Sequence, residues 1–417
     1  MTGRGLASNL PPLSPQETQH QAAVVAAVKA AVAEQGGWLS LEEYLRIVLY
    51  APGLGYYSAG SVKLGRDGDF VTAPELSALF GRALARQCAE LLALSGGEVL
   101  ELGAGTGALA ATLLPELAML GRLPQRYAIL EVSADLAARQ RARLAALPAH
   151  LRERVHWLLQ PPEALHGICL ANEVADALPF RRFVVGQSGY LERGIAQGGD
   201  GALIEADRPA DAELTGQIER LAHTLMASRP LVPQAADAAR AGQAPQAVEA
   251  PWPAGYSSEI CLLLPGWLHS ISAPLQQGAL LLIDYGLGRH EYYHPQRTRG
   301  TLRCHFRHRA HEDVLLHPGL QDVTAWVDFT RVAEAGVEAG LDIAGYCTQA
   351  AFLLANGIEQ DVAGAADSMQ RTRLAAEARQ LLLPGEMGEV FKVMALTRGL
   401  PGATLRGFAY QDLRRTL

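Results

Sequence analysis

The stretch that decides the predicted fold is Val99-Leu100-Glu101-Leu102-Gly103-Ala104-Gly105-Thr106-Gly107. A short strand runs into a turn with three glycines, and residues 108–120 continue with the apolar spacing of a helix. Glycine permits positive φ angles and lets a ligand come close to the backbone. The first turn of the helix offers free N–H groups. This unit predicts a nucleotide-like ligand at the carboxyl end of a parallel strand.

Strands and helices alternate on both sides of this turn. Strands are predicted at 127–132, 155–158, 168–173, 279–284, 341–346 and 390–396, and helices at 77–94, 108–120, 134–147, 258–271, 326–339 and 367–382. Such alternation indicates βαβ units and a parallel sheet. We therefore predict an α/β fold with a doubly wound, Rossmann-like sheet, an N-terminal helical region and two insertions.

Composition and texture divide the chain into regions. Residues 1–19 are predicted to be a flexible tail, and 20–95 an N-terminal helical region with a Gly/Tyr/Pro-rich loop. The two halves of the core are predicted at 96–180 and 257–400. An insertion, 181–256, separates them and contains a hairpin and a mobile Ala/Gln/Pro-rich stretch. A second, loop-like insertion occupies 286–322, and 401–417 is predicted to be a C-terminal tail.

The composition narrows the class of protein. The chain has 49% hydrophobic and 19% charged residues, as globular proteins do, and a net charge of −7, which disfavours nucleic acid as the main partner. No apolar run is long enough to cross a bilayer.

The five cysteines form no C-x-x-C pair, and the six histidines within 286–322 lack partners at a recognised ligand spacing, so no metal site is predicted. The N-terminus lacks signal features, and we expect a bacterial cytoplasm.

Two ligands compete for the glycine turn. Gly103-x-Gly105-x-x-Ala108 also fits the dinucleotide fingerprint of an NAD-dependent oxidoreductase. Three features favour S-adenosylmethionine: Glu101 can meet the methionine ammonium, a third glycine follows, and the strand at 390–396 can add a hairpin edge. Glu131 can bind ribose hydroxyls with either ligand, and its alternative is a surface carboxylate. The predicted cofactor contacts here are Glu101, Gly103, Ala104, Gly105, Gly107, Glu131 and Val132.

Other stretches, from about residue 41 to 396, resemble the MidA family of methyltransferases. The motifs are Gly53–Tyr57, Gly68–Ser77, Phe80-Gly81, the glycine turn, Leu130–Ser133, Ala171–Pro179, Ile283–Gly286, Gly300–Arg303 with His308, Asp322–Thr324 and Met387–Lys392. The resemblance implies a class I methyltransferase sheet and S-adenosyl-L-methionine as cofactor. The family's mitochondrial members, which are arginine methyltransferases needed for complex I assembly, imply a protein substrate, with a respiratory-complex subunit as one candidate. The resemblance leaves the oligomeric state open.

Methylation of arginine requires carboxylates, because the guanidinium stays protonated in water and must be oriented and deprotonated. The fourth predicted strand ends at Asn172-Glu173, and Asp176 follows three residues later. We predict Glu173 as the catalytic guanidinium anchor, Asp176 as its catalytic partner and Asn172 as a cofactor contact. The alternative for Asp176 is that it only caps the following turn.

Loops are expected to complete the site. Asp69 and Thr72 are predicted cofactor contacts in a lid, with a packed loop that never meets ligand as the alternative. The predicted substrate contacts are Tyr57, Asp284, Arg303 and His308, the last two because they fall within the family match. A function of a different class also stays open: an assembly factor that binds S-adenosylmethionine with little catalysis.

Overall fold

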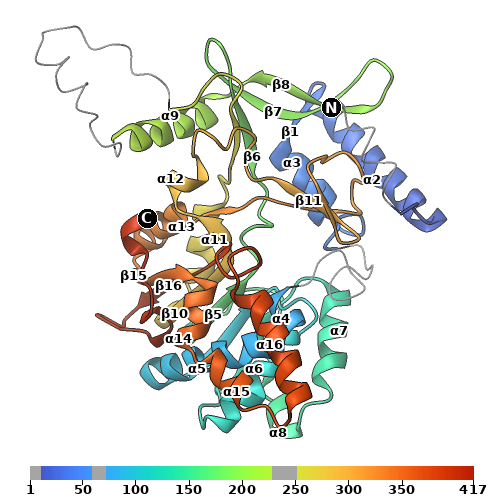
Figure 1. Ribbon diagram of the computed structural model, residues 1–417. Helices are drawn as coiled ribbons and strands as arrows, with labels where there is room; N and C mark the ends of the chain where they lie inside the picture. The colour runs from blue at the N-terminus through green and yellow to red at the C-terminus, as the bar shows by residue number, and fades with distance from the viewer. Residues whose placement is uncertain (1–10, 59–71, 228–250) are drawn as a thin grey trace, which may run out of the picture.

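The computed structural model of the protein describes residues 11–58, 72–227 and 251–417. Within these residues an eight-stranded sheet, in the lower half of Figure 1, has the order β15-β16-β10-β5-β2-β3-β4, with β14 beside β10. The bounds of its strands are β2 Glu98–Leu102, β3 Tyr127–Leu130, β4 Val155–Leu158, β5 Leu165–Asn172, β10 Leu275–Leu287, β14 Val327–Asp328, β15 Asp342–Thr348 and β16 Phe391–Arg398.

The direction of the strands places the site. Strands β10, β5, β2, β3 and β4 run parallel, so their carboxyl ends share one edge of the sheet. Strand β16 lies antiparallel between β10 and β15. It buries seven consecutive residues, 391–397, because both faces of the sheet are covered. The hairpin edge predicted at 390–396 is therefore confirmed.

Helices cover both faces of this sheet (Figure 1). One apolar core includes residues of α5 (Ala78–Ser95), α6 (Ala108–Met119), α14 (Gln349–Ala355), α15 (Ile358–Ala363) and α16 (Ser368–Leu382). The core on the other face includes residues of α11 (Leu264–Ser272) and α13 (Phe329–Glu338). Helices α7 (Ala134–Leu144) and α8 (Ala149–Arg152) connect β3 to β4. These two separate cores confirm the doubly wound α/β fold predicted from the sequence.

A second part lies above the sheet in Figure 1. Its antiparallel sheet has the order β1-β7-β6-β9, with β8 on β7, and a smaller sheet has the order β12-β11-β13. Strand bounds are β1 Trp38–Ser40, β6 Arg181–Val185, β7 Tyr190–Gln197, β8 Leu203–Pro209, β9 Ser257–Ile260, β11 Arg303–Phe306, β12 Arg309–His311 and β13 Asp322–Thr324. Its helices are α2 Pro15–Glu34, α3 Leu41–Leu45, the π-helix η1 Arg46–Tyr50, α9 Ala212–Ala227 and α12 Arg289–Tyr292.

Two expectations about this part are wrong in detail, and one helix was not predicted. Residues 257–260 form β9 rather than the start of a helix, because they pair with the free edge of β6. The insertion 286–322 contains α12, β11 and β12 and is not simply a loop. Helix α9 was not predicted within 181–256, although its buried residues Leu214, Ile218, Leu221 and Leu225 have helical spacing.

The N-terminal tail predicted for 1–19 ends earlier than expected, because α2 begins at Pro15. Ser14 Oγ accepts a hydrogen bond from the Glu17 amide (3.2 Å), and Glu17 Oε2 accepts one from the Ser14 amide (2.7 Å). This reciprocal pair is a capping box, and proline is favoured in the first helical turn. The local signal for the helix start was therefore present in the sequence.

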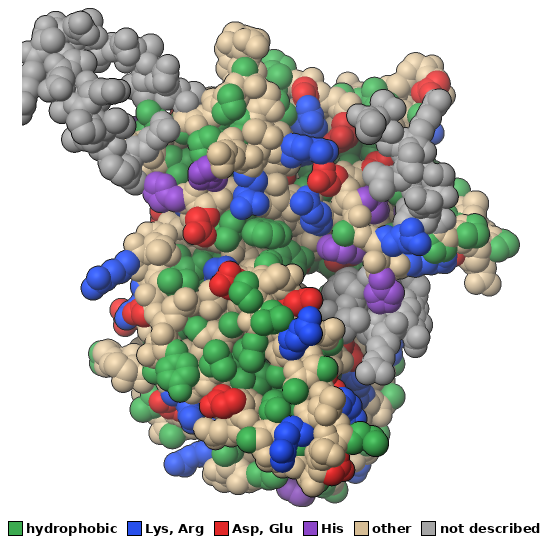
Figure 2. All heavy atoms as spheres, in the orientation of Figure 1, with side chains coloured by type: hydrophobic (Ala, Val, Ile, Leu, Met, Phe, Trp, Pro, Cys, Tyr) green, Lys and Arg blue, Asp and Glu red, His purple; other side chains and the backbone are tan. Residues whose placement is uncertain are grey.

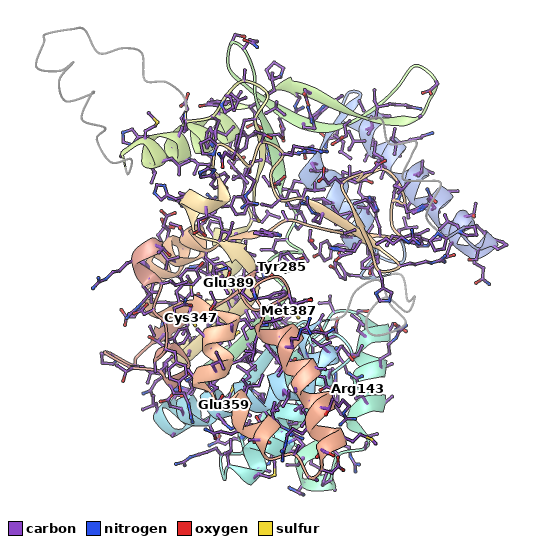
Figure 3. The ribbon with its side chains drawn as sticks, viewed as in Figure 1. Arg143, Tyr285, Cys347, Glu359, Met387 and Glu389 are labelled. Atoms are coloured by element: carbon purple, nitrogen blue, oxygen red, sulfur yellow. The ribbon has the colours of Figure 1, made fainter. Side chains whose placement is uncertain are left out.

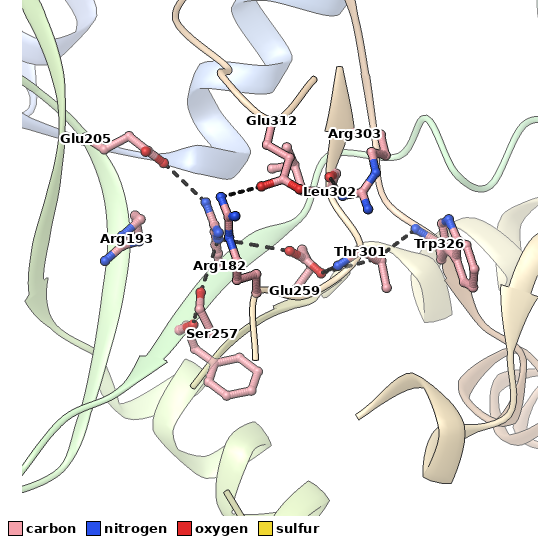
Figure 4. Close-up of polar contacts among 12 residues, drawn as sticks. Arg182, Arg193, Glu205, Ser257, Glu259, Thr301, Leu302, Arg303, Glu312 and Trp326 are labelled. Carbon is pink, nitrogen blue, oxygen red and sulfur yellow. Dashed lines mark hydrogen bonds and ion pairs between the residues drawn. The ribbon is translucent and has the colours of Figure 1, made fainter. Parts of the chain in front are cut away.

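A buried glutamate anchors the second insertion to β9 (Figure 4). Glu259 Oε2 accepts hydrogen bonds from the Thr301 amide (2.8 Å) and hydroxyl (3.2 Å), and Arg182 Nε lies 4.0 Å from Glu259 Oε1. The Thr301 hydroxyl in turn accepts a bond from the Trp326 amide (3.1 Å). Gly300 has φ +72°, and a Cβ there would lie 2.2 Å from Glu259 Oε1. The family motif Gly300–Arg303 is thereby explained as an anchor that only glycine permits.

The C-terminal residues 401–417 pack against the sheet edge, so the tail predicted for them is wrong. Phe408 is 8% exposed and its ring centroid lies 5.7 Å from that of Phe352. A Cβ at Gly345 would lie only 2.3 Å from the Phe408 ring, so β15 offers a gap that the phenylalanine fills. The chain then returns to β15, where the Leu413 amide donates to the Tyr346 carbonyl (2.7 Å).

This packing predicts an unequal response of two neighbouring aromatic residues. Phe408→Ala should lower the free energy of unfolding by about 3 kcal/mol, because it removes a buried ring and leaves a cavity. Tyr410→Ala is the matched control, since Tyr410 is 70% exposed and should change stability little. Urea unfolding of both variants measures the difference. Equal stability of the two would show that 401–417 is a loose tail after all.

Candidate active site

The glycine turn between β2 and α6 adopts a backbone that glycine favours. Gly103, Gly105 and Gly107 have φ angles of 57°, 54° and 84°. Ala104 is buried beneath the turn, and the α6 N-terminus receives no side-chain cap. The free N–H groups and the missing side chains leave a cradle in which a ligand can touch the backbone.

Glu131 follows β3 and is only 7% exposed, so the surface-carboxylate alternative is wrong. Its Oε1 accepts a hydrogen bond from the Ser133 amide (2.8 Å) and its Oε2 one from Gln140 Nε2 (3.1 Å). Burial raises the pKa of this carboxyl group, and the two hydrogen bonds oppose that shift. Glu131 is therefore held in one position beside the glycine turn.

Two apolar side chains stand exposed at the same sheet edge. Val132 follows β3 and is 81% exposed, and Leu159 follows the neighbouring strand β4 and is 75% exposed. Large apolar side chains at a ligand-binding edge favour contact with a planar or apolar ligand group. This position suits the ring of a nucleoside whose ribose is held by Glu131.

Glu101 lies inside β2 and is buried against Tyr127, whose hydroxyl donates to Glu101 Oε2 (2.7 Å). Desolvation raises the pKa of Glu101 to about 7, although the hydrogen bond from Tyr127 opposes the rise. A nearby ammonium group would stabilise the ionised form. Together with the cradle and Glu131, this carboxyl group fits a ligand that carries both a ribose and an ammonium, as S-adenosylmethionine does.

Glu173 ends β5 in a strained conformation. Its φ of +54° is unusual for a residue other than glycine. Its Oε1 accepts hydrogen bonds from Asn172 Nδ2 (3.2 Å) and from the Ala73 amide (3.3 Å). Desolvation, followed by repulsion from Asp176, raises the pKa of Glu173 to about 8. Strain of this kind persists where the surroundings hold a functional side chain in place.

Asp176 lies close to Glu173 and has a different hydrogen-bonding environment. The Tyr285 hydroxyl contacts both Asp176 Oδ2 and Thr324 Oγ1, the latter at 2.8 Å. Asp176 Oδ1 is buried and has no hydrogen-bond partner among the residues described. Burial raises the pKa of Asp176 to about 6. Hydrogen bonds from the backbone at residues 176 and 177 oppose this rise, as the turn-cap alternative would predict, while the contact with Tyr285 joins Asp176 to the site.

Asp284, a predicted substrate contact, supports this loop from below. Its Oδ2 accepts hydrogen bonds from the Ala175 amide (3.0 Å) and the Asp176 amide (3.2 Å), and its Oδ1 accepts one from the Tyr285 amide (2.9 Å). The side chain is fully buried, and desolvation holds its pKa well above the usual range. The geometry therefore favours Asp284 as a positioning residue rather than one that touches substrate.

The upper part of the molecule supplies an aromatic wall and one more carboxylate. The Tyr57 hydroxyl donates to Asp322 Oδ1 (2.6 Å), and the Tyr50 hydroxyl donates to the Ala177 carbonyl (2.7 Å). The two tyrosine rings stack with centroids 5.4 Å apart. Asp322 and Tyr50 were not among the predicted site residues, although Asp322 lies in a recognised family motif. Only the fold brings Asp322 near Glu173 and Tyr50 near Asp176.

The cluster lies where the two parts meet. Tyr285 lies at this level in Figure 3, and Figure 2 shows the surface hollowed between the upper and lower parts. Asp322 contributes to the raised pKa values of Glu173 and of Tyr285, as a nearby negative charge does. The acidic residues and the predicted cofactor contacts therefore face the same place, where the upper and lower parts of the molecule meet.

Thr72 and the helix α4 (Ala73–Leu76) lie between the glycine turn and the acidic residues that follow β5. The Thr72 carbonyl accepts a bond from the Glu75 amide (3.0 Å). The Glu75 carboxylate contacts Thr106 of the glycine turn. It also pairs with Arg143 of α7, whose Nη1 lies 2.7 Å away (Figure 3). Asp69 lies outside the described residues. Helix α4 thus contacts the cofactor turn while its first amide contacts Glu173.

Two predicted substrate contacts have no contact with Glu173 or Asp176 among those found in the described residues. Arg303 lies opposite Thr324 in the β11–β13 pair, but its side chain is exposed and pairs with Glu312 (3.2 Å); both residues are labelled in Figure 4. His308 is exposed and stands with Arg307 in the two-residue turn between β11 and β12, where both have positive φ (61° and 47°). This is the pattern of a type I′ hairpin turn. Strand β12 is on the edge away from β13, which carries Asp322.

Among the described residues, no group of three or more His, Cys, Asp or Glu side chains is arranged to hold a metal ion. The cysteines at 88, 169, 261, 304 and 347 are all free thiols. In the same residues, no helix combines the length and the apolar character that crossing a membrane requires.

The glycine cradle predicts a specific loss of cofactor binding. Gly103→Val should reduce affinity for S-adenosylhomocysteine at least about 100-fold, because a β-branched residue at φ +57° shifts the turn and its Cβ enters the cradle. Gly402→Val is the matched control: φ there is +67° and no atom lies within 4 Å of a Cβ. Calorimetric titration should show normal affinity for the control and almost none for Gly103→Val.

The burial of Glu101 predicts a pH dependence of binding. A carboxyl pKa of about 7 means that the group is protonated below pH 7 and ionised above it. An ammonium prefers the ionised form, so affinity for S-adenosylhomocysteine should rise about tenfold between pH 6 and pH 8. Glu101→Gln should remove most of that rise. Calorimetry at both pH values tests this, and an equal rise in both proteins would contradict it.

Known proteins of similar structure and sequence identify the ligand. A protein from Burkholderia thailandensis, solved with bound S-adenosyl-homocysteine, is 42% identical; the match covers 98% of this chain and 100% of that one, with a TM-score of 0.86. The chain is 27% identical to "Protein arginine methyltransferase NDUFAF7, mitochondrial" of Danio rerio, covering 86% of this chain and 83% of that protein. The same protein of Mus musculus is 29% identical, with 89% and 83% covered. The cofactor is therefore S-adenosyl-L-methionine and not NAD.

A family model also indicates S-adenosyl-L-methionine as the cofactor. Residues 83–347 match the family described as an S-adenosyl-L-methionine-dependent methyltransferase. The match covers more than half of the chain, and it includes the glycine turn and the acidic cluster at the end of β5. The chain belongs to the MidA-like family of S-adenosyl-L-methionine-dependent methyltransferases.

Proposed function

We propose that this methyltransferase transfers the methyl group to an arginine guanidinium of a protein substrate. The observation that carries the proposal is a pair of buried carboxylates, Glu173 and Asp176, that have no cationic partner among the described residues. Among the described residues, no Lys or Arg forms an ion pair with Glu173 or Asp176, and negative neighbours raise the pKa of Glu173. Buried carboxylates are normally paired. A cationic acceptor is the partner that this cluster lacks.

The hydrogen-bonding capacity of the cluster favours guanidinium over a single ammonium. Asp176 Oδ1 and Asn172 Oδ1 are both buried acceptors without a partner among the described residues. A guanidinium carries five N–H donors in a rigid plane and can satisfy several acceptors at once. The stacked Tyr50 and Tyr57 rings beside the cluster suit a flat cation, which aromatic faces also attract.

The residues of this chain orient the acceptor and take its proton. When bound, S-adenosylmethionine supplies a methyl group on a positively charged sulfur. Glu173 and Asp176 would hold the guanidinium so that one nitrogen faces that methyl group. As this nitrogen forms its new bond to carbon, its proton would pass to the Glu173 carboxylate. Glu173 must be ionised to accept it, and a bound cation lowers the pKa that burial raises.

The names of similar proteins also support arginine as the methyl acceptor. The similar proteins of Danio rerio and Mus musculus are named protein arginine methyltransferases and are mitochondrial. Their names support arginine within a protein as the substrate class. The resemblance to the MidA family adds a respiratory-complex subunit as a candidate partner. The intact cofactor site and acidic cluster support catalysis over the alternative of an assembly factor that only binds S-adenosylmethionine.

The test uses Glu173→Gln, which keeps the shape of the side chain but removes its charge and its capacity to accept a proton. A lysate from cells lacking this gene is incubated with methyl-labelled S-adenosylmethionine and either the wild-type protein or the variant. Wild type should produce labelled methylarginine, found by mass spectrometry. Glu173→Gln should lose at least about 100-fold of that activity, the low end for a lost general base. Its affinity for S-adenosylhomocysteine should stay within a few-fold.

Two comparisons make the result specific. Asp176→Asn should show a milder loss, and Glu338→Gln, at an exposed position on α13, should be fully active. The wild-type kcat/KM should rise with pH up to about 8, since it reports the protein without bound acceptor, in which desolvation raises the pKa of Glu173 to about that value. Label on a neutral acceptor, or full activity of Glu173→Gln, would sink the arginine proposal. Cofactor binding without any transfer would favour the assembly-factor alternative.

A further inference from the structure

Gln140 on α7 joins the two halves of the cofactor site through its side-chain amide. Its side chain is completely buried. Nε2 donates to the Gly105 carbonyl (2.9 Å) and to Glu131 Oε2 (3.1 Å), and Oε1 accepts from Trp157 Nε1 (2.8 Å). One amide therefore contacts the glycine turn, the carboxylate that follows β3 and the indole of β4.

The orientation of this amide is determined by its partners. The indole N–H of Trp157 can only donate, so it must face the amide oxygen. The carbonyl of Gly105 can only accept, so it must face the amide nitrogen. The reversed amide would place donor against donor and acceptor against acceptor. Trp157 is itself held by the Arg141 guanidinium, 4.5 Å above the indole ring, so the network has a fixed outer end.

The packing around the amide leaves little freedom. Gly107 has no side chain, and a Cβ there would lie 3.4 Å from Gln140 Cα and 3.5 Å from Cβ. The turn and α7 therefore approach each other closely. Without the Gln140 amide, Glu131 Oε2 would lose its 3.1 Å hydrogen bond, while the Ser133 amide (2.8 Å) would still hold Oε1.

We propose that Gln140 is a positioning residue for S-adenosylmethionine, which sets the separation between the glycine turn and Glu131. It acts through Gly105 and Glu131 rather than by contact with the cofactor. The turn must hold the methionine end and Glu131 the ribose, so a shift of either relative to the other weakens both contacts. The proposal rests on the cofactor site and is independent of which substrate accepts the methyl group.

The first test compares two buried glutamines. Gln140→Ala should weaken binding of S-adenosylhomocysteine about 10- to 100-fold, since it leaves a carbonyl and a carboxylate without their donor. Gln87→Ala is the matched control. Gln87 is equally buried and uses both ends of its amide, to Glu90 (2.8 Å) and from the Gly407 amide (2.8 Å), but lies on α5. Gln87→Ala should melt at a lower temperature yet bind normally. Equal, near-normal affinity of both variants would overturn the proposal.

The second test separates positioning from folding by keeping the side-chain shape. Gln140→Glu is isosteric, but its ionised form places a negative charge against Glu131 and the Gly105 carbonyl. The ratio of its dissociation constant to that of wild type should therefore grow at least about tenfold from pH 5.5 to pH 8. A purely structural role would leave this ratio constant, and a constant ratio would contradict the proposal.

The third test asks whether Gln140 acts through Glu131. The affinity losses of Glu131→Ala and Gln140→Ala should sum to more than the loss in the double variant, because the second change removes an interaction that the first has already disrupted. Full additivity would show that Gln140 does not position Glu131. All three tests measure cofactor binding, so they can fail while the arginine proposal stands, and the reverse is equally possible.

Discussion

The carboxyl ends of five parallel strands meet at one edge of the central sheet, and the whole site depends on that alignment. The register places Asn172 beside Ile283, so the Glu173 amide donates to the Ile283 carbonyl (2.9 Å) and Asp284 follows next to it. Strand β2 delivers the glycine turn and β3 delivers Glu131 to the same edge. Cofactor groups and acidic groups therefore lie side by side, although more than 180 residues separate the first from the last.

Desolvation explains why the acidic groups at this edge have raised pKa values. Glu101, Glu173, Asp176 and Asp284 all lie in low-dielectric surroundings, and burial is the largest cause of the shift in each. Among the described residues, hydrogen bonds and not cations hold these four groups. The donors are a tyrosine hydroxyl for Glu101 and Asp176, the Asn172 side chain and a backbone amide for Glu173, and backbone amides for Asp284. Such a site favours ligands that bring positive charge. Both the cofactor and the proposed acceptor are cations.

The second part of the molecule completes the site rather than forming a separate unit. Tyr50 of η1 bonds to the Ala177 carbonyl (2.7 Å), and Tyr57 holds Asp322 of β13 (2.6 Å). The anchor from Glu259 to Thr301 ties the second insertion to β9 (Figure 4). The N-terminal region and the inserted segments thus form the wall that faces the carboxyl edge of the sheet, where the proposed protein substrate would enter.

Local signals in the sequence were sufficient for the parallel strands, the glycine turn, Glu131 and the acidic stretch that follows β5, because strand periodicity and glycine spacing act over a few residues. The order of the strands in the sheet came only from the structure. Such signals could also have revealed the capping box at Ser14 and the helix α9. Only the tertiary structure decided which distant residues join them. It brought Asp322 near Glu173 and Tyr50 near Asp176, directed Asp284 toward backbone amides, and placed His308 in a hairpin turn. The physical reason is that contacts across the junction depend on how the insertions pack against the sheet, which no short stretch of sequence encodes.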